Sequence, residues 1–128
     1  MTLQYFPIVA CAPTSNPDAA PYDKRWLVID GAGRLLMRKQ YPALAQITVA
    51  ISFGYLAIRA PGMLRMDIPL DVIEDDDSVC REITIGGQQI RVVDEGDLTA
   101  AWMSNYLGAP SRLVKIHPES TVVFWPEL

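Results

Sequence analysis

The sequence predicts a mainly β fold, a small irregular β-barrel with an added β-hairpin and one α-helix in the C-terminal half. Short apolar segments recur along the chain and are separated by Gly or Pro turns, as in barrels and sandwiches. Residues 54–70 alternate between apolar and polar side chains, the period of a half-buried strand. Residues 98–107 instead repeat apolar side chains at helical spacing. With 128 residues, 50% of them hydrophobic, residues 1–128 are expected to form one domain with its own core.

The charge and hydropathy of the chain argue against several classes of partner. The net charge is -4 and no run of basic residues occurs, whereas nucleic-acid-binding proteins cluster Lys and Arg. An acidic surface is also unsuited to an anionic membrane, and no apolar run reaches the length of a membrane span. Residues 1–4 lack the basic and apolar regions of a signal peptide, so a cytoplasmic location is expected.

The first elements are predicted to be an edge strand, a loop and a central hairpin. Residues 3–11 are apolar and β-prone, but Pro7 cannot donate to a ladder, so the strand is expected at an edge. Residues 12–23 hold three prolines and are predicted to form a loop. Residues 26–30 and 34–38 then form a hairpin about a Gly-Ala-Gly turn. Because this hairpin is apolar on both faces, it is expected to be covered on both faces.

The next elements are predicted to be a third strand and a clear hairpin. Residues 44–52 read as a strand, preceded by a possible helical turn at residues 43–46. Within residues 54–70, Pro61 and Gly62 fit the two central positions of a type II turn. The return strand of this hairpin is predicted to place four side chains on the core, namely Leu64, Met66, Ile68 and Leu70.

The second half contains an acidic loop and another hairpin. Residues 74–78 carry four adjacent carboxylates, which could suggest a Ca²⁺ or Mg²⁺ site. The spaced ligands and the turn glycine of a calcium loop are missing, so a solvated loop is the better interpretation. Residues 80–85 and 89–93 are predicted to pair about Gly86 and Gly87.

The helix at residues 98–107 is predicted from its two ends. Asp97 is a good N-cap, Gly108 suits the position after the last turn, and Pro110 prevents continuation. Four residues share its predicted apolar face, namely Leu98, Ala101, Trp102 and Tyr106. Residues 112–116 and 121–125 read as final strands.

The sequence offers few groups for catalysis or metal binding, and no catalytic or metal-ligating residue is assigned. His117, the single histidine, follows an apolar strand and is interpreted as a surface or capping group. Cys11 and Cys80 are interpreted as buried reduced thiols, although a disulfide stays open because sequence gives no distance between them. One His and two distant Cys do not make a zinc site.

A cationic cluster is the candidate ligand site. Arg25 and Arg38 occupy the outer ends of the two strands of the central hairpin, where antiparallel chains lie side by side. Together with Lys24 or Lys39 they would suit a phosphate or a carboxylate. If the chain binds an anionic ligand, the hypothesis is that Lys24, Arg25 and Arg38 form the site. The alternative is a solvated strand end in which the cations pair with Asp23 or Asp30.

Two blocks of the sequence match motifs of one known protein family. The first block, residues 23–47, matches a D-R-x-W-hydrophobic-D-x-x-G pattern followed by Arg, Pro and Leu. Its matching residues are Asp23, Trp26, Asp30, Gly33, Arg38, Pro42 and Leu44. The second block matches D-x-G-D, W-hydrophobic-S, L-G and R-L-V through Asp94, Gly96, Asp97, Trp102, Ser104, Leu107, Gly108 and residues 112–114. Through these residues the chain resembles the N-terminal β-barrel domain of the MOSC family, molybdenum-cofactor proteins that include the mitochondrial amidoxime-reducing component.

This sequence departs from the family where the cofactor would bind. The family's Lys and Ser, which the resemblance implies hold the cofactor phosphate, are Val9 and Ala10 here. The Arg of D-R-x-W is Lys24, which keeps the charge and loses the bidentate fork. The chain also stops about where the family's second domain, with its molybdenum-binding cysteine, would begin. No molybdenum cofactor is therefore expected to be bound by this chain alone.

The expected function is that of a stand-alone, non-catalytic relative of the MOSC N-terminal domain, acting as a binding or interaction module. Its expected partner is a small anionic ligand or a MOSC-domain protein. One alternative is the accessory half of a molybdenum oxidoreductase whose catalytic domain is on another chain, and it predicts a retained anion site. A small independent enzyme is a further alternative, and it predicts convergent titratable groups.

Overall fold

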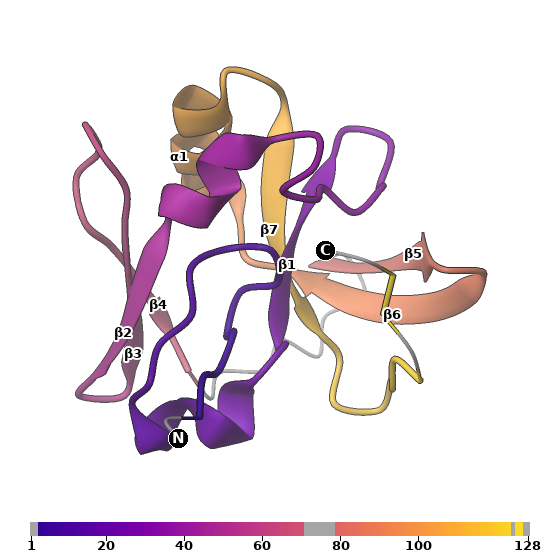
Figure 1. Ribbon diagram of the computed structural model, residues 1–128. Coiled ribbons are helices and arrows are strands. Elements are labelled where there is room, and N and C mark those ends of the chain that lie inside the picture. Colours follow the sequence, from indigo (N-terminus) through magenta and orange to yellow (C-terminus); the bar gives the residue numbers. More distant parts are fainter. Residues whose placement is uncertain (1–2, 71–78, 124, 127–128) are drawn as a thin grey trace.

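The fold is mainly β, as the sequence predicts. The computed structural model describes residues 3–70, 79–123 and 125–126 (Figure 1). The strands are β1 (Trp26–Asp30), β2 (Thr48–Ser52), β3 (Tyr55–Arg59), β4 (Met66–Pro69), β5 (Cys80–Ile85), β6 (Gln88–Asp94) and β7 (Ser111–Ile116). The helices are the 3-10 helices η1 (Pro17–Tyr22) and η2 (Pro42–Gln46) and the α-helix α1 (Asp97–Leu107). The predicted acidic loop at residues 74–78 lies outside the described residues.

The larger sheet is antiparallel, with the strand order β1-β7-β6-β5. It curls around the core, and the β5–β6 hairpin extends away from the second sheet (Figure 1). Four successive residues of β1, Trp26 to Ile29, are completely buried, because β1 is covered on both faces. This confirms that the segment is covered on both faces, as predicted, although β1 is the terminal strand of its sheet rather than a central one. The predicted pairing of residues 80–85 with 89–93 is also confirmed.

The smaller sheet has the order β2-β3-β4 and contains the predicted hairpin. The type II turn is confirmed, because the Met63 N–H donates to the Ala60 carbonyl at 3.1 Å and Gly62 has a φ of +75°. Ile68 and Leu70 are buried as predicted, but Leu64 is 87% exposed. The prediction for Leu64 was wrong, since β4 begins only at Met66 and Leu64 still belongs to the turn.

The second strand of the central hairpin is shorter and less regular than predicted. The Asp30 N–H donates to the Arg34 carbonyl and the Leu36 N–H donates to the Val28 carbonyl, each at 2.9 Å. Ile29 and Leu35 form an isolated bridge, after which the chain leaves the sheet. The regular partner of β1 is β7 on its other side. The prediction of a full strand at residues 34–38 was therefore wrong, although the turn itself is correct.

The N-terminal segment does not form the predicted strand at residues 3–11. Beyond a bridge between Tyr5 and Thr14, its regular contact is a parallel bridge between Ile8 and Trp26. The chain then turns tightly, with the Cys11 N–H donating to the Ile8 carbonyl at 3.2 Å and Ala10 at a φ of +71°. Pro7 lacks an N–H and this turn follows directly, so a ladder cannot continue.

Two further segments differ from the prediction. The predicted loop at residues 12–23 contains η1, whose first turn is capped by the Asn16 side chain. The predicted strand at residues 121–125 is wrong, because its described residues form no strand and Val123 is 83% exposed. The helical turn predicted at residues 43–46 is confirmed as η2.

Helix α1 begins and packs differently from the prediction. Its N-cap is Gly96 at a φ of +106°, and the predicted N-cap Asp97 is the first helical residue. The buried side chains are Thr99, Ala100 and Met103, whereas Leu98 is 90% exposed, so the predicted apolar face was wrong at Leu98 and Ala101. The end of the helix is confirmed, with Gly108 in the left-handed region and its N–H donating to the Ser104 carbonyl.

Candidate functional site

Lys24 and Arg25, two of the three cations predicted to bind an anion, line one shallow pocket of about 340 Å³. They lie directly before β1, and the opposite wall is the end of β7 with the segment that follows it. Ser120 and Trp125 belong to this opposite wall. The N–H of Arg91 donates to the Ser120 hydroxyl oxygen at 3.0 Å, which leaves the hydroxyl hydrogen free to donate into the pocket.

Two carboxylates lie near these cations in the sequence, and neither forms an ion pair with them in the described residues. Asp23 also lines the pocket, where its Oδ1 accepts the backbone N–H of Phe6 at 2.7 Å, and Asp30 pairs with Arg34. The Arg25 guanidinium has a long contact of 3.5 Å with the Pro21 carbonyl. Across the described ranges, neither Lys24 nor Arg25 forms an ion pair. The pairing of these cations with Asp23 or Asp30, the alternative drawn from sequence, is therefore not the arrangement observed.

Arg38 lies outside this pocket. Its guanidinium carbon is 5.9 Å from the centroid of the Phe6 ring, a cation–π contact. The backbone N–H of Phe6 donates to Asp23 Oδ1 at 2.7 Å, and the Lys24 N–H donates to the Phe6 carbonyl at 2.7 Å. The structure thus brings Lys24 and Arg25 together and places Arg38 on Phe6. An anion-binding role for the three residues stays a prediction.

The two positions at which the family has Lys and Ser are inside the core. Val9 is completely buried and Ala10 is 1% exposed. The Val9 N–H donates to the Trp26 carbonyl at 2.8 Å, so this segment is fixed against β1. Neither side chain can donate a hydrogen bond, and neither reaches solvent.

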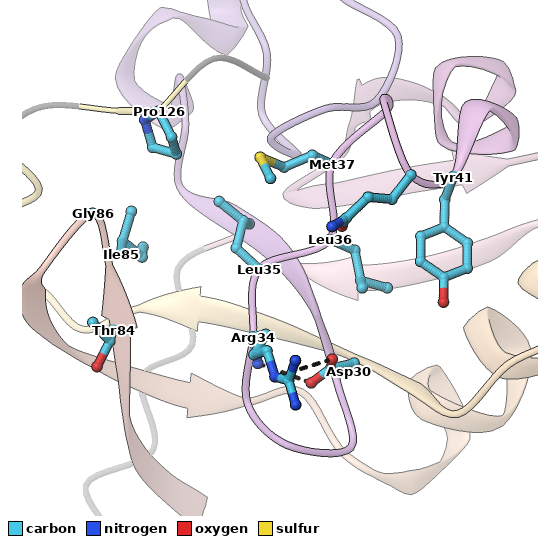
Figure 2. A pocket seen from close by; sticks show the side chains of 11 residues that line it. Asp30, Arg34, Leu35, Leu36, Met37, Tyr41, Thr84, Ile85, Gly86 and Pro126 are labelled. Atoms are coloured by element: carbon cyan, nitrogen blue, oxygen red, sulfur yellow. Dashed lines mark hydrogen bonds and ion pairs between the residues drawn. The ribbon is translucent and has the colours of Figure 1, made fainter.

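A larger apolar pocket, of about 590 Å³, was missed by the sequence (Figure 2). It is formed by the segment after β1 and by the turn between β5 and β6, which are far apart along the chain. Leu35, Leu36, Met37 and Tyr41 line one side and Ile85 the other. No spacing in the sequence indicates that these segments meet, so only a search for tertiary contacts could have found the pocket.

The polar end of this apolar pocket is the pair of Asp30 and Arg34. Asp30 Oδ1 accepts the backbone N–H groups of Arg34 at 2.9 Å and Ala32 at 2.8 Å. These bonds, Arg34's first, hold the pKa of the Asp30 carboxyl below its ordinary value. Asp30 Oδ2 has only a long 3.9 Å contact with Arg34 Nε, and the Arg34 side chain is 81% exposed.

The second family block forms a cluster of charged residues with a structural role. We call Arg81, Asp94, Asp97 and Arg112 the charged cluster. Asp94 accepts from Gly96 N–H at 2.8 Å and from Arg112 at both oxygens, while Arg112 Nη2 also donates to Asp97 at 2.7 Å. Burial raises the pKa of the Asp94 carboxyl, but the hydrogen bonds of Arg112 and Gly96 outweigh it and hold that pKa below its ordinary value. The cluster joins β5, β6, α1 and β7.

A buried charged side chain that the sequence did not indicate is Lys115, which lies on β7 opposite Trp26 of β1. The Lys115 side chain is 6% exposed, donates to the Leu70 carbonyl and lies 5.1 Å from the centroid of the Trp26 ring. Burial raises the pKa of the neighbouring Glu95 carboxyl, and the charge of Lys115 opposes that shift. These contacts link β7 to the end of the smaller sheet.

His117 and Cys11 have the structural roles that the sequence favours, whereas the prediction that Cys80 is buried was wrong. The His117 Nδ1 accepts the Glu119 N–H at 3.1 Å, which confirms a capping role, although the residue is only 9% exposed rather than on the surface. Cys11 and Cys80 are both free; Cys11 is buried as predicted, and Cys80 is half-buried. Among the described residues, no group of three or more His, Cys, Asp or Glu is placed to hold a metal ion.

The two cysteines should differ sharply in reactivity. Burial raises the pKa of the Cys11 thiol to about 12, with Arg38 only partly opposing the shift, so little thiolate forms near neutral pH. An alkylating reagent at pH 8 should therefore modify Cys80 in the native chain and both cysteines in urea. Mass spectrometry of the modified peptides checks this, and equal labelling of both native thiols would contradict it.

Comparisons with known proteins agree with the mainly β fold of this chain. The family model described as "MOSC N-terminal beta barrel domain" matches residues 1–110. The molybdenum cofactor sulfurase of Danio rerio is 30% identical over 123 residues, which are 89% of this chain and 15% of that protein. The mitochondrial amidoxime-reducing component 1 of Danio rerio is 28% identical over 99 residues, 76% of this chain and 30% of that protein.

A solved structure is similar over almost its whole length. It is the solution structure of a protein coded by a gene locus of Bordetella bronchiseptica, with 52% identity, a TM-score of 0.84 and coverage of 98% of this chain and 97% of that chain. By contrast, this chain spans less than a third of the two named Danio rerio relatives. In the described part of the chain, no helix has the length and apolar character needed to cross a bilayer. The chain belongs to the family of MOSC N-terminal beta barrel domains.

Proposed function

We propose that this chain is a non-catalytic binding module that takes a small anionic ligand in the pocket at Lys24 and Arg25. One observation carries the proposal: two cations without a carboxylate partner in the described ranges face the same pocket. The Ser120 hydroxyl adds a neutral donor beside them, and Trp125 adds an apolar wall. Guanidinium and ammonium groups with a nearby hydroxyl are suited to a phosphate or a carboxylate.

The proposal of a module without its own chemistry rests on how the reactive groups are used. The Cys11 thiol is buried with a raised pKa, and His117 caps a turn. Asp94, the carboxylate with the most partners, is held by Arg112 and Arg81. The named activities of the relatives belong to proteins of which this chain covers a small part, and Val9 and Ala10 offer no donor for a cofactor phosphate.

Titration with inorganic phosphate at low salt, followed by amide chemical shifts, tests the anion site. We expect saturable shifts at Lys24, Arg25 and Ser120, and Lys24→Ala and Arg25→Ala should each weaken binding by about tenfold, because each removes a charge-assisted contact. Arg65→Ala is the matched control, since it removes an exposed arginine that pairs with Asp67 on the other sheet. Raising the salt concentration should weaken binding further.

Two outcomes decide between versions of the site. If Arg38→Ala abolishes phosphate binding, the site is the three-cation cluster predicted from sequence; if Arg38→Ala binds normally, the pocket walls suffice. Unchanged affinity in both Lys24→Ala and Arg25→Ala, or no saturable shift with the native chain, would reject the anion site.

A second candidate function, the accessory half of a split molybdenum oxidoreductase, is favoured by one surface. Leu64 and Leu98 are 87% and 90% exposed on either side of a groove formed by α1 and the β3–β4 turn. Exposed apolar side chains gathered in one place are typical of protein interfaces. Affinity purification of the tagged chain from its native cells, with intact mass and molybdenum content, tests this. A co-purifying MOSC-domain chain with stoichiometric molybdenum would support it, and a metal-free single chain would reject it.

A further inference from the structure

We propose that the apolar pocket between residues 34–41, which we call the β1 loop, and the β5–β6 turn is a second binding site. Its ligand would be a small neutral molecule with an apolar body and one amide-like group. This site is separate from the anion pocket at Lys24 and Arg25 and does not depend on it. Its volume of about 590 Å³ lies within the range of about 300–1,000 Å³ that is usual for small-molecule sites.

The walls of the pocket determine the body of the ligand. Figure 2 shows Leu35 and Ile85 on opposite sides of the hollow, with Met37 and Tyr41 further along the same loop as Leu35. Leu35 and Tyr41 are half-buried side chains packed on the core, and Met37 is half-buried as well, so each of the three keeps a solvent-accessible portion. An apolar ring or branched chain placed here would remove that remaining apolar surface from water.

The polar end of the pocket determines the polar group of the ligand. The Asp30 carboxylate and the Arg34 guanidinium sum to zero charge, so a ligand with a net charge gains at one group what it loses at the other. Within the part of the chain that the structure describes, Asp30 Oδ2 has no partner closer than the 3.9 Å contact with Arg34 Nε, and the exposed guanidinium carries further N–H donors. A carboxamide fits both, since its oxygen accepts from Arg34 and its N–H donates to Asp30.

The pocket is built in advance rather than closed around a ligand. Asp30 Oδ1 fixes the turn before this segment by accepting the backbone N–H groups of Ala32 and Arg34. Leu36 is 3% exposed, and its backbone N–H donates to the Val28 carbonyl. On the other side, Ile85 pairs with Gln88 at the end of the β5–β6 ladder. Binding therefore requires little ordering of the chain, which favours affinity even for a small ligand.

Benzamide is the probe that we would titrate into the whole chain, with amide and methionine methyl shifts as the measurement. We expect saturable shifts at Leu35, Met37 and Ile85, with a dissociation constant on the order of 1 mM for so small a molecule. Benzoate and toluene should each bind about fivefold more weakly, because benzoate meets the Asp30 carboxylate and toluene lacks the polar group. Lys24 and Arg25 should not shift with benzamide.

Two exposed positions provide variants that leave the core intact. Arg34→Ala should weaken benzamide binding by about fivefold, because it removes the donor at the polar end. Thr84→Tyr places a ring in the pocket and should weaken binding by about tenfold. The matched controls are Arg65→Ala, an exposed arginine on the other sheet, and Glu82→Tyr, an exposed position on β5 outside the pocket.

Each outcome bears on the proposal. Pocket-localised shifts that are weakened in Arg34→Ala and Thr84→Tyr but kept in both controls would support it. Absence of saturable shifts at Leu35, Met37 and Ile85 would overturn it, as would equal binding by Thr84→Tyr and the native chain. Toluene or benzoate binding as tightly as benzamide would overturn the assignment of an amide-like ligand. Phosphate titration of Arg34→Ala separates this result from the anion pocket, which should bind normally.

Discussion

Replacing Arg112 with alanine should lower the free energy of unfolding by about 3 kcal/mol, measured by urea denaturation at pH 7. Arg112 donates to both oxygens of Asp94, whose side chain is 6% exposed, and also to Asp97. The substitution leaves a buried carboxylate with Arg81, at 3.1 Å, as its remaining cation. Removing one partner of a buried ion pair is costly because the other charge stays out of water.

Three comparisons sharpen the Arg112 prediction. Arg65→Ala removes an exposed arginine paired with Asp67 and should change stability by less than about 1 kcal/mol. The double variant Asp94→Asn, Arg112→Met should be more stable than Arg112→Ala, because no buried charge is left alone. The deficit of Arg112→Ala should also shrink as the pH falls through the folded pKa of Asp94, which lies below its ordinary value. A deficit equal to that of Arg65→Ala would mean that the charged cluster does not hold α1 on the sheet.

This arrangement explains what the sequence could and could not predict about the helix. The end of α1 was predictable because it depends on Gly108 alone, a residue that accepts a positive φ. Its beginning was not, because Asp97 is a good local N-cap that is instead used by Arg112, fifteen residues further along the chain. Gly96 occupies the N-cap position instead, and the helix is oriented so that Met103, rather than Leu98, faces the core. Tertiary contacts outweighed the local signal.

The same contrast separates the correct strands from the wrong ones. Hairpins with turn residues such as Pro61-Gly62 and Gly86-Gly87 were predictable, because pairing and turn are both local. Residues 3–11 and 121–125 have the composition of strands, but those of them that the structure describes have no continuous strand partner. Composition reports that a segment is apolar enough to be buried, and Ile8 and Val9 are fully buried without a ladder. It does not report whether a neighbouring backbone is available.

The positions of the candidate site residues were predictable in part, for a related reason, while their binding of an anion stays a prediction. Lys24 and Arg25 share a pocket because they are adjacent in sequence. Arg38 was expected beside Arg25 on the assumption of a full-length hairpin, but the ladder ends at Leu36 and Arg38 instead lies over Phe6. The apolar pocket needs the β1 loop and the β5–β6 turn to meet, and the side chains there, Leu35 and Ile85, carry no mark of function. Chemistry can be read from residue types, whereas a cavity depends on packing.

Trp26, the tryptophan of the first family block, should be the other position with a large effect on stability. Trp26→Ala is expected to lower the free energy of unfolding by about 4 kcal/mol, because the side chain is completely buried and a cavity would remain. The ring also stacks on Tyr22 with centroids 6.1 Å apart and faces the Lys115 ammonium at 5.1 Å. Thermal and urea unfolding would measure the loss.

A conservative variant keeps the Trp26 prediction testable if Trp26→Ala does not fold. Trp26→Phe retains a ring against Tyr22 and Lys115 and should lose roughly half as much stability, whereas Trp125→Phe, at a half-buried position after β7, should lose less than about 1 kcal/mol. If Trp26→Phe and Trp125→Phe were equally stable, the Trp26 ring would not be a structural requirement of β1. A loss of stability in Trp26→Phe but not in Trp125→Phe would instead mean that this family position serves the fold. The Trp26 ring packs against the buried Lys115 side chain and lines neither of the two pockets.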